Sequence, residues 1–414
     1  MAEEQCTSNM TFSQLTTFPT LRGRWRGLVL VAFCTALQAA PHTPTQDSEV
    51  IERLPFRPGD TTARELSALR ASVAKSPNDP EPALALAQRY FELATARGDP
   101  RYVGYADALV GRFSAKMTAP LLAMRGTVRQ YRHDFTDALS DYAAALKLDT
   151  DFAGAHAWRG AIYLVQANYT AAAQECEALL RLQRPVLNGG CAGLTQAYTG
   201  HLATAYKTLQ KALAITHDDD QRLWLNTRLA EVAAWQGQMA LAEQHYRRAL
   251  DLGIDDGYLL AAWSDFLLDQ GHPDQVIQQL AKWETVDGLL LRLAEAETAL
   301  KLPSAKIHVL TLGDRFAAAK LRGDTTHQAE EARFYLHLRN DAKEAVRLST
   351  TNYEVQKEPR DARIVLESAL AARNPTAAQP VLDWLQSSGF EDPALRALAR
   401  QVQQLPAATN GAVK

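Results

Sequence analysis

Pairs of small residues recur along the middle of this 414-residue chain, and their spacing constrains the fold more than any other feature. The pairs are Gly126 with Ala138, Gly160 with Ala172, Gly193 with Ala205, Ala230 with Ala242, and Ser264 with Val276. The members of a pair stand 12 residues apart, and successive pairs follow one another after 33 to 37 residues. A unit of about 34 residues accommodates two helices and their turns, and helices cross closely where small residues meet. The pattern therefore predicts stacked antiparallel helix pairs, because one pair alone cannot bury its apolar face.

The length of the chain limits the possible folds, and its charge balance limits the possible partners. One hydrophobic core rarely serves 414 residues, so the length allows either several domains or one elongated array. Hydrophobic residues make up 47% of the chain and charged residues 22%, which is typical of a folded protein. Lys and Arg total 44 against 47 Asp and Glu, so nucleic acid, which needs a basic face, is excluded as the main partner. Together with the repeat, this composition predicts an all-α array.

The residues at fixed positions of the unit resemble the tetratricopeptide repeat (TPR) family. The match rests on Ala83, Leu86, Ala87 and Tyr90; on Gly126, Ala138, Tyr142 and Ala145; on Gly160, Tyr163 and Ala172; and on Leu229, Ala230, Ala242, Tyr246 and Ala249. The resemblance implies a right-handed α-solenoid of antiparallel helix pairs with a concave groove. The family's preferred proline at the end of a unit is replaced by Thr150, Arg184 and His217, which leaves the unit boundaries less sharply defined.

Five segments follow from these patterns. Residues 1–39 read as a signal peptide and 40–60 as a linker, and 404–414 as a disordered tail rich in Ala, Asn and Gly. Residues 61–283 hold about six TPR-like units, including a leading cap helix at 61–75. Residues 284–403 hold degenerate helical repeats, with helices expected at 287–300, 304–321, 330–338, 341–348, 361–372 and 376–385.

The leader has the order of a secretory signal. Residues 22–26 read Arg-Gly-Arg-Trp-Arg, and the uncharged run 27–40 then ends in small residues before Pro41. A run of this length is short for a bilayer-spanning helix. We therefore expect a cleaved signal peptide, a periplasmic or secreted protein of bacterial type, and no transmembrane segment after signal removal. The alternative is an uncleaved segment that tethers the protein to the membrane.

Two cysteines remain after the leader is removed. Cys176 falls on the second helix of one unit and Cys191 on the first helix of the next, nearly equidistant from the turn at Arg184. These helices are antiparallel neighbours, so the two side chains could face one another and form a disulfide in an oxidising compartment. The alternative is two buried free thiols that act as small hydrophobic side chains.

Signatures of enzymes are absent from the sequence. It contains no phosphate-binding loop, no Gly-x-Gly-x-x-Gly motif, no nucleophile elbow and no His-Glu-x-x-His motif. The ten histidines are scattered, without a pair at metal-ligand spacing. We expect no enzymatic activity, no cofactor and no metal.

Family geometry places selected positions of each first helix in the concave groove. The predicted groove residues are Tyr131, Leu164, Val165, Tyr198, Trp224, Glu231, Trp235, Tyr258, Asp265, Leu268 and Asp269. Aromatic rings above small neighbours favour an extended apolar or amphipathic peptide. In the other interpretation, some of the rings fill gaps between adjacent first helices.

The resulting prediction is an exported, non-enzymatic scaffold or adaptor that binds a protein or peptide partner, with a role in assembling an envelope or secretion complex. The alternative function is a glycan-binding module in which the same rings stack on sugars. The sequence names neither the partner nor the oligomeric state.

Overall fold

The structure is a computed structural model that describes residues 60–406. The predicted signal peptide, all of the predicted linker but Asp60, and residues 407–414 of the predicted tail lie outside the described residues. Within residues 60–406 the chain forms twenty α-helices and one short 3-10 helix, without a β-strand. The predicted all-α fold is confirmed.

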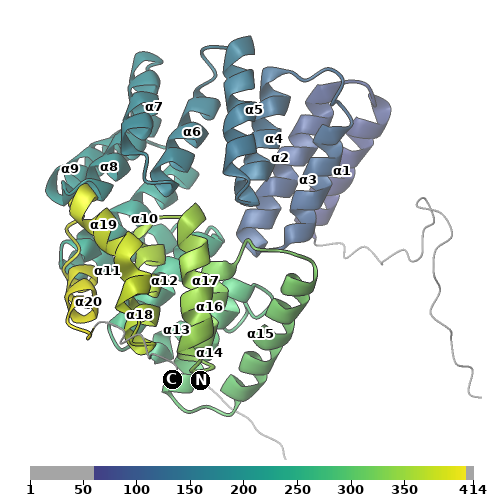
Figure 1. Cartoon of the computed structure of the whole chain (residues 1–414). Coiled ribbons are helices and arrows are strands. Elements are labelled where there is room, and N and C mark those ends of the chain that lie inside the picture. Colours follow the sequence, from purple (N-terminus) through teal and green to yellow (C-terminus); the bar gives the residue numbers. More distant parts are fainter. Residues whose placement is uncertain (1–59, 407–414) are drawn as a thin grey trace, which may run out of the picture. The chain divides into compact units, whose positions relative to one another are not determined.

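The helices follow one another in antiparallel pairs, as Figure 1 shows. Their bounds are α1 Thr61–Lys75, α2 Pro80–Arg97, α3 Pro100–Gly111, α4 Ala119–Tyr131, α5 Phe135–Leu148, α6 Ala153–Val165, α7 Tyr169–Arg181, α8 Pro185–Tyr198, α9 Leu202–Ile215, α10 Asp219–Trp235, α11 Met239–Leu250, α12 Gly257–Asp269, α13 Pro273–Leu280, α14 Asp287–Ala299, α15 Ser304–Leu321, α16 Gln328–His337, α17 Ala342–Val355, α18 Pro359–Ala371, the 3-10 helix η1 Pro375–Ala378, α19 Gln379–Ser388 and α20 Pro393–Gln403. The helix α1 has the bounds expected at 61–75, and Asp60 caps its N-terminus by accepting a hydrogen bond from the amide of Ala63.

The turn inside each pair has one residue in the left-handed backbone region. These residues are Gly98, His133, Ala167, Gly200, Gly237, Gly271, Lys301, Asn340 and Arg373. In the α6–α7 turn, for example, the amide of Asn168 donates to the carbonyl of Tyr163 at 2.8 Å, which closes the end of the first helix. These turns recur every 30 to 39 residues up to Arg373. The helix-pair repeat therefore continues past residue 283, where the sequence match decays.

Small residues bring the two helices of a pair together, and at Gly193 the predicted partner is close, because an added Cβ atom would lie 3.5 Å from the carbonyl oxygen of Ala205. A Cβ atom added at Gly126 would lie 2.9 Å from the ring of Tyr142, and one at Gly193 would lie 2.7 Å from Leu209. In these two pairs the nearest atoms belong to the side chain sixteen residues later, four beyond the predicted small residue, whereas at Gly160 they belong to Cys191 and Glu175. Glycine is required because a large side chain of the second helix fills the space between the two backbones.

The last helices fold back onto the middle of the array. One hydrophobic core combines buried residues of α8, α9 and α10 with buried residues of α18, α19 and α20, which lie side by side in Figure 1. A backbone hydrogen bond from the amide of Lys357 to the carbonyl of Val165, 2.7 Å long, also links the two regions. Gly200 lies where they meet, because a Cβ atom there would come within 2.6 Å of the carbonyl oxygen of Gly389. The array is therefore in contact with itself across large sequence separations.

None of the helices described within residues 60–406 is long and apolar enough to cross a membrane.

Candidate functional site

The predicted groove residues all lie on first helices of the pairs, and most of them contact later parts of the same chain. Tyr131 is on α4, Leu164 and Val165 are on α6, Tyr198 is on α8, Trp224, Glu231 and Trp235 are on α10, and Tyr258, Asp265, Leu268 and Asp269 are on α12. Leu164 is buried in the core shared with α18–α20, and Leu268 is partly buried against the core of α10–α16. We define the covered half of the concave face as the first helices α8, α10 and α12, and the open half as α2, α4 and α6 up to Tyr163, since Leu164 already belongs to the shared core.

An aromatic cluster closes the centre of the covered half. The ring of Phe390, which follows α19, lies 6.3 Å from the ring of Tyr198 and 5.2 Å from that of Trp235, edge to face in both cases. Phe390 is fully buried and Tyr198 is only 4% exposed. Burial raises the pKa of Tyr198 well above its usual value. Because the chain's own C-terminal region occupies these ring faces, they are not available for stacking on a sugar.

Beside this cluster, Tyr258 lies among charged groups. Its hydroxyl donates to Glu231, and the same hydroxyl accepts from Arg228, both at 2.5 Å. The guanidinium carbons of Arg228 and of Arg360, from α18, lie 4.3 and 5.2 Å from the ring centre of Tyr258. Burial raises the pKa of Tyr258, so its hydroxyl keeps the proton that it donates. Tyr258, which was predicted to contact a partner, therefore links α18 to α10.

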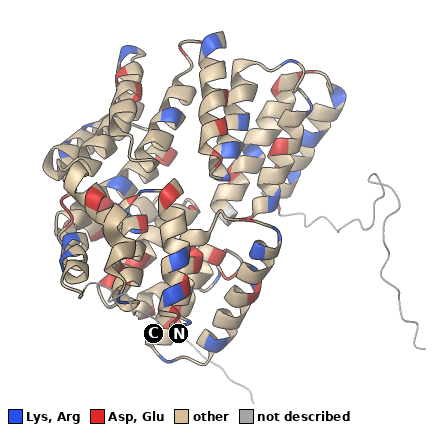
Figure 2. Cartoon of the chain, viewed as in Figure 1, with Lys and Arg blue, Asp and Glu red and all other residues tan. Residues whose placement is uncertain are grey.

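Arginines from later helices also neutralise the two predicted aspartates of α12. Asp265 accepts from Arg292 at 2.7 and 2.9 Å and from Arg333 at 2.6 Å. Burial acts to raise the pKa of Asp265, but these two arginines outweigh it and hold that pKa well below the usual range. Asp269 accepts two hydrogen bonds from Arg363 at 2.6 and 2.7 Å. In the view of Figure 2, acidic and basic residues are interspersed in the same way along the helices.

Trp224 fills a gap between adjacent first helices, which was the alternative interpretation of the groove rings. It is half-buried on α10 and lies over Gly190 of α8, where an added Cβ atom would come within 2.0 Å of the indole. The small residue and the large ring are therefore complementary, and the ring fills the gap between adjacent first helices.

The open half contrasts with this packing. Tyr131 is half-buried and meets Phe91 of α2 edge to face, with 5.9 Å between ring centres. Glu92 and Pro120, on the same face of α2 and α4, are exposed. Val165, at the end of α6 and just beyond the open half, is only partly buried. Tyr131 thus remains partly accessible at the repeat position where Tyr198 is buried and Asp269 is ion-paired in the covered half.

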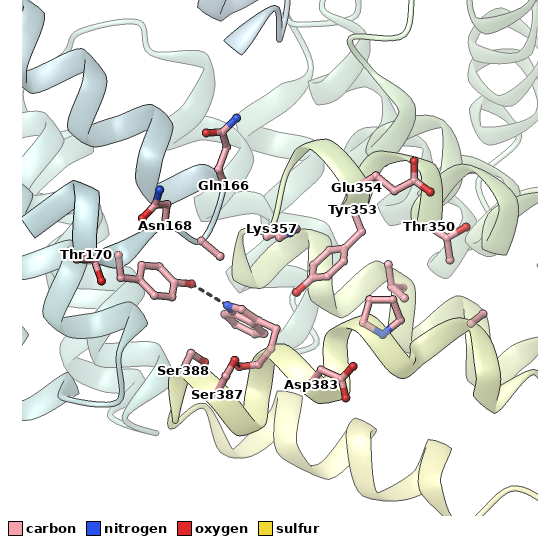
Figure 3. A pocket seen from close by; sticks show the side chains of 16 residues that line it. Gln166, Asn168, Thr170, Thr350, Tyr353, Glu354, Lys357, Asp383, Ser387 and Ser388 are labelled. Carbon is pink, nitrogen blue, oxygen red and sulfur yellow. Dashed lines mark hydrogen bonds between the residues drawn. The ribbon is translucent and has the colours of Figure 1, made fainter. Parts of the chain in front are cut away.

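Two neighbouring clefts lie where the open half meets the folded-back region. The first, of about 840 Å³, is formed by the α6–α7 turn, α17, α18 and α19, and the second, of about 580 Å³, by the α4–α5 turn and the end of α17. Gln166, Glu354 and Lys357 line both clefts. Figure 3 shows the first cleft, with Tyr353 and Asp383 on one side and Asn168 and Thr170 on the other. Sequence reasoning missed these residues because no repeat position relates segments that are more than 180 residues apart.

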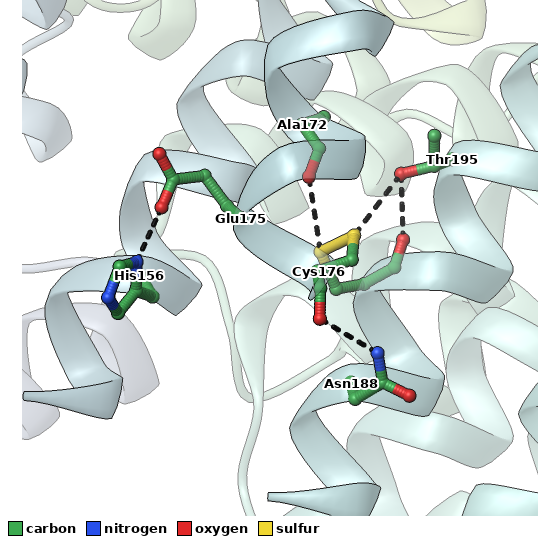
Figure 4. The surroundings of a disulfide bond; sticks show 7 residues. His156, Ala172, Glu175, Cys176, Asn188 and Thr195 are labelled. Carbon is green, nitrogen blue, oxygen red and sulfur yellow. Dashed lines mark hydrogen bonds and ion pairs between the residues drawn. A yellow bond between two sulfur atoms is a disulfide. The ribbon is translucent and has the colours of Figure 1, made fainter. Parts of the chain in front are cut away.

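The structure joins Cys176 of α7 to Cys191 of α8 by a disulfide (Figure 4). Their Cα atoms are 5.5 Å apart, which is within the range that a disulfide spans without backbone movement. Both cysteines are buried. Next to them, the Glu175 carboxylate lies 2.6 Å from Nδ1 of His156. The bond links two consecutive helix pairs at the border between the open and covered halves.

Within residues 60–406, no three His, Cys, Asp or Glu side chains are grouped so that they could hold a metal ion.

No protein-family model matches the chain, and no curated protein is similar to it in sequence. Among solved structures, a tetratricopeptide repeat protein from Parabacteroides merdae is 15% identical over 57% of this chain and 86% of that one, with a TM-score of 0.37. Yeast Tom70 is 14% identical over 83% of this chain and 62% of its own, with a TM-score of 0.35. A TPR repeat-containing protein from Cytophaga hutchinsonii is 16% identical over 58% of this chain and 93% of that one, with a TM-score of 0.31.

Proposed function

We propose that the chain is an exported, non-enzymatic scaffold that binds a protein or peptide partner on its concave face. The observation that carries this proposal is that the concave face already holds polypeptide: α18–α20 lie against α8, α9 and α10. Phe390 serves as a buried aromatic anchor, and Arg363 pairs with Asp269 at the edge. Buried aromatic anchors surrounded by polar contacts are also the means by which partner chains bind each other.

The partner would bind the open half, because the covered half is filled. Tyr131 is the aromatic side chain that remains partly accessible there among the predicted groove residues. Its ring packs edge to face against Phe91, so it would offer a rigid surface at low entropic cost.

Affinity capture from envelope extracts of the source cells tests this assignment. Tyr131→Ala should reduce the recovered partner about tenfold relative to the wild type, as expected for loss of an aromatic hot spot. Leu180→Ala is the matched control, because Leu180 is 61% exposed on the second helix α7. Equal recovery of the same partners by both variants and the wild type would contradict binding at the open half. A variant that combines Tyr131→Ala with Tyr198→Ala and Trp235→Ala would be unsuitable, since Tyr198 and Trp235 pack in the core.

Export is the second part of the proposal. It is supported by the leader-like sequence of residues 1–39 and by the placement of Cys176 and Cys191 at bonding distance. The bond closes a loop of 15 residues, so its reduction should lower the free energy of unfolding by about 3 kcal/mol. Mass spectrometry of the protein isolated from the envelope, with and without reductant, should show one disulfide and an N-terminus near residue 40. Two free thiols, or an intact leader, would refute the corresponding part of the proposal. A partner in envelope or secretion complex assembly would fit such a location.

A further inference from the structure

The larger cleft contains a buried hydroxyl group without a partner. Tyr353 is 4% exposed, and its hydroxyl forms no hydrogen bond within the described residues. The side chain lines the cleft of about 840 Å³, and Figure 3 shows its hydroxyl pointing into the space between the two walls. A buried polar group without a partner is costly, and such exceptions call for an explanation. A hydrogen-bond acceptor supplied by a ligand would satisfy this group.

The opposite wall offers a second hydroxyl group. Tyr169, at the start of α7, accepts a hydrogen bond of 2.7 Å from the indole Nε1 of Trp384, which Figure 3 marks by a dashed line. Burial raises the pKa of Tyr169 to about 12, so this hydroxyl keeps its own proton. With one lone pair engaged by Trp384, the Tyr169 hydroxyl still has a hydrogen to donate. The two tyrosines therefore present a pair of donors to one occupant of the cleft.

The rest of the lining is apolar near the tyrosines and acidic toward the second cleft. Ala167, Val365 and Pro380 line the larger cleft beside the two rings. Glu354 lies in both clefts, and Asp134 and Asp137 line the smaller one. Asp383 adds a fourth carboxylate, and Lys357 is the one cationic side chain lining both clefts. Four carboxylates against one ammonium group favour an occupant with positive charge.

We propose that the two clefts form one binding site for an extended, basic segment of a partner polypeptide. A large apolar side chain of the segment enters the larger cleft, and backbone carbonyls beside it accept hydrogen bonds from Tyr353 and Tyr169. Lys or Arg residues of the segment then lie over Asp134, Asp137 and Glu354. A volume of about 840 Å³ is within the range of ordinary ligand pockets. This inference rests on the proposed scaffold function and names the chemistry of the partner.

The test measures binding of defined peptides to the full chain by fluorescence anisotropy. Two pools of labelled nonapeptides share a central Trp, Phe or Leu; one has flanks of Lys, Arg, Ser and Gly, and the other has Asp and Glu in place of Lys and Arg. The basic pool should bind at least tenfold more tightly than the acidic pool at low salt, and this preference should shrink as the ionic strength rises. Equal binding of both pools, or a preference for the acidic pool, would overturn the proposal.

Two variants locate the binding. Tyr353→Phe should weaken binding of the basic pool about threefold to tenfold, as expected for one lost hydrogen bond. The same variant should leave the melting temperature unchanged or raised, because the hydroxyl has no partner in the free protein. Asp137→Asn should weaken binding and reduce its salt dependence. Tyr335→Phe is the matched control, because Tyr335 is half-buried on α16 and lines neither cleft.

The outcomes separate this inference from the scaffold function. If Tyr353→Phe and Asp137→Asn bind the basic pool as the wild type does, the cleft is not the binding site, while capture through Tyr131 can still succeed. If no pool binds but the envelope partner is still captured, the inference fails and the scaffold function stands. If the pools bind in the clefts and Tyr131→Ala captures its partners unchanged, the open-half assignment fails instead.

Discussion

The two halves of the concave face differ most clearly at Tyr131 and Tyr198, which occupy the same repeat position. At the last concave position of the first helix, the open half has Tyr131, which is half-buried, whereas the covered half has Tyr198, which is 4% exposed beneath Phe390. The difference does not come from the repeat, because both residues are aromatic and both end a first helix. It comes from what the rest of the chain places over them. In this array, position within the unit determines which way a side chain points but not whether it meets solvent or core.

Removing the ring that closes the covered half should have the largest effect. Phe390 is fully buried among Tyr198, Trp235 and Trp384, so Phe390→Ala should lower the free energy of unfolding by about 3–5 kcal/mol. Tyr131→Ala in the open half should cost only about 1 kcal/mol, because its ring is half-buried. Urea unfolding followed by circular dichroism measures both.

Similar losses in the free energy of unfolding for Phe390→Ala and Tyr131→Ala would contradict this difference between the halves. They would mean that the covered half contributes no more to the core than the open half. Phe390→Leu is a useful control. It keeps most of the apolar volume and should recover a large part of the loss.

The stability of the covered half should also depend on pH, because of Asp361. This carboxyl group is 2% exposed and accepts hydrogen bonds from Asn352 and from the amide of Glu358. Burial, assisted by the nearby Glu358 carboxylate and opposed by Arg360, raises the pKa of Asp361 to about 7. The unfolded value is about 3.9. Since the folded pKa is the higher one, the stability from this group is fully present below pH 4 and is lost as the pH rises through 7.

Asp361→Asn should therefore flatten the change in melting temperature between pH 4.5 and 8. Thermal unfolding of both proteins across this range measures the effect, and the gap between them should change with pH. A constant gap between wild type and variant would show that Asp361 does not titrate in this window.

The smallest effect is expected at the edge of the covered half. Arg363 and Asp269 form a two-pronged ion pair, but their side chains are 45% and 44% exposed. Exposed pairs contribute about 0.2–1 kcal/mol and are weakened by salt. Arg363→Gln should thus cost at most about 1 kcal/mol in dilute buffer and almost nothing at 1 M NaCl. Arg363 also pairs with Glu367 at 2.7 Å; burial acts to raise the pKa of Glu367, but His337 and Arg363 lower it to about 2, and His337 stays beside Glu367 in the variant. A loss above 2 kcal/mol that persists in salt would indicate that this edge is part of the core.

Local patterns in the sequence predict most helix positions, although the helix expected at 341–348 continues to Val355 and the one expected at 376–385 is a 3-10 turn followed by α19. The helices expected at 61–75 and 304–321 have those bounds in the structure, and the helix expected at 287–300 ends at Ala299. These predictions succeed because a helix is limited by its own apolar spacing and by residues such as Asp60 that cap it. The predicted groove residues lie on first helices as family geometry implies. Their role in binding a partner stays a prediction.

The covering of the groove could not be predicted from the sequence. Phe390 and Tyr198 are 192 positions apart, and neither residue carries a pattern that points to the other. The segment that contains Phe390 belongs to the degenerate part of the repeat. Contacts of this kind are determined by the accumulated rotation of many helix pairs, which local spacing does not specify. The cleft between Tyr169 and Tyr353 could not be predicted from the sequence for the same reason.

The folding back of α18–α20 changes the order in which this array can be completed. In a linear solenoid each new pair buries the previous one, so that a growing chain folds as it is made. Here the core around Tyr198 and Trp235 is completed by residues 359–403, which are synthesised long after those two residues. Until residues 359–403 have folded onto it, the middle of the chain has an exposed aromatic surface of the kind that chaperones and proteases recognise. A chain truncated before Pro359 therefore cannot reach the same folded state, because it lacks the helices that complete this core.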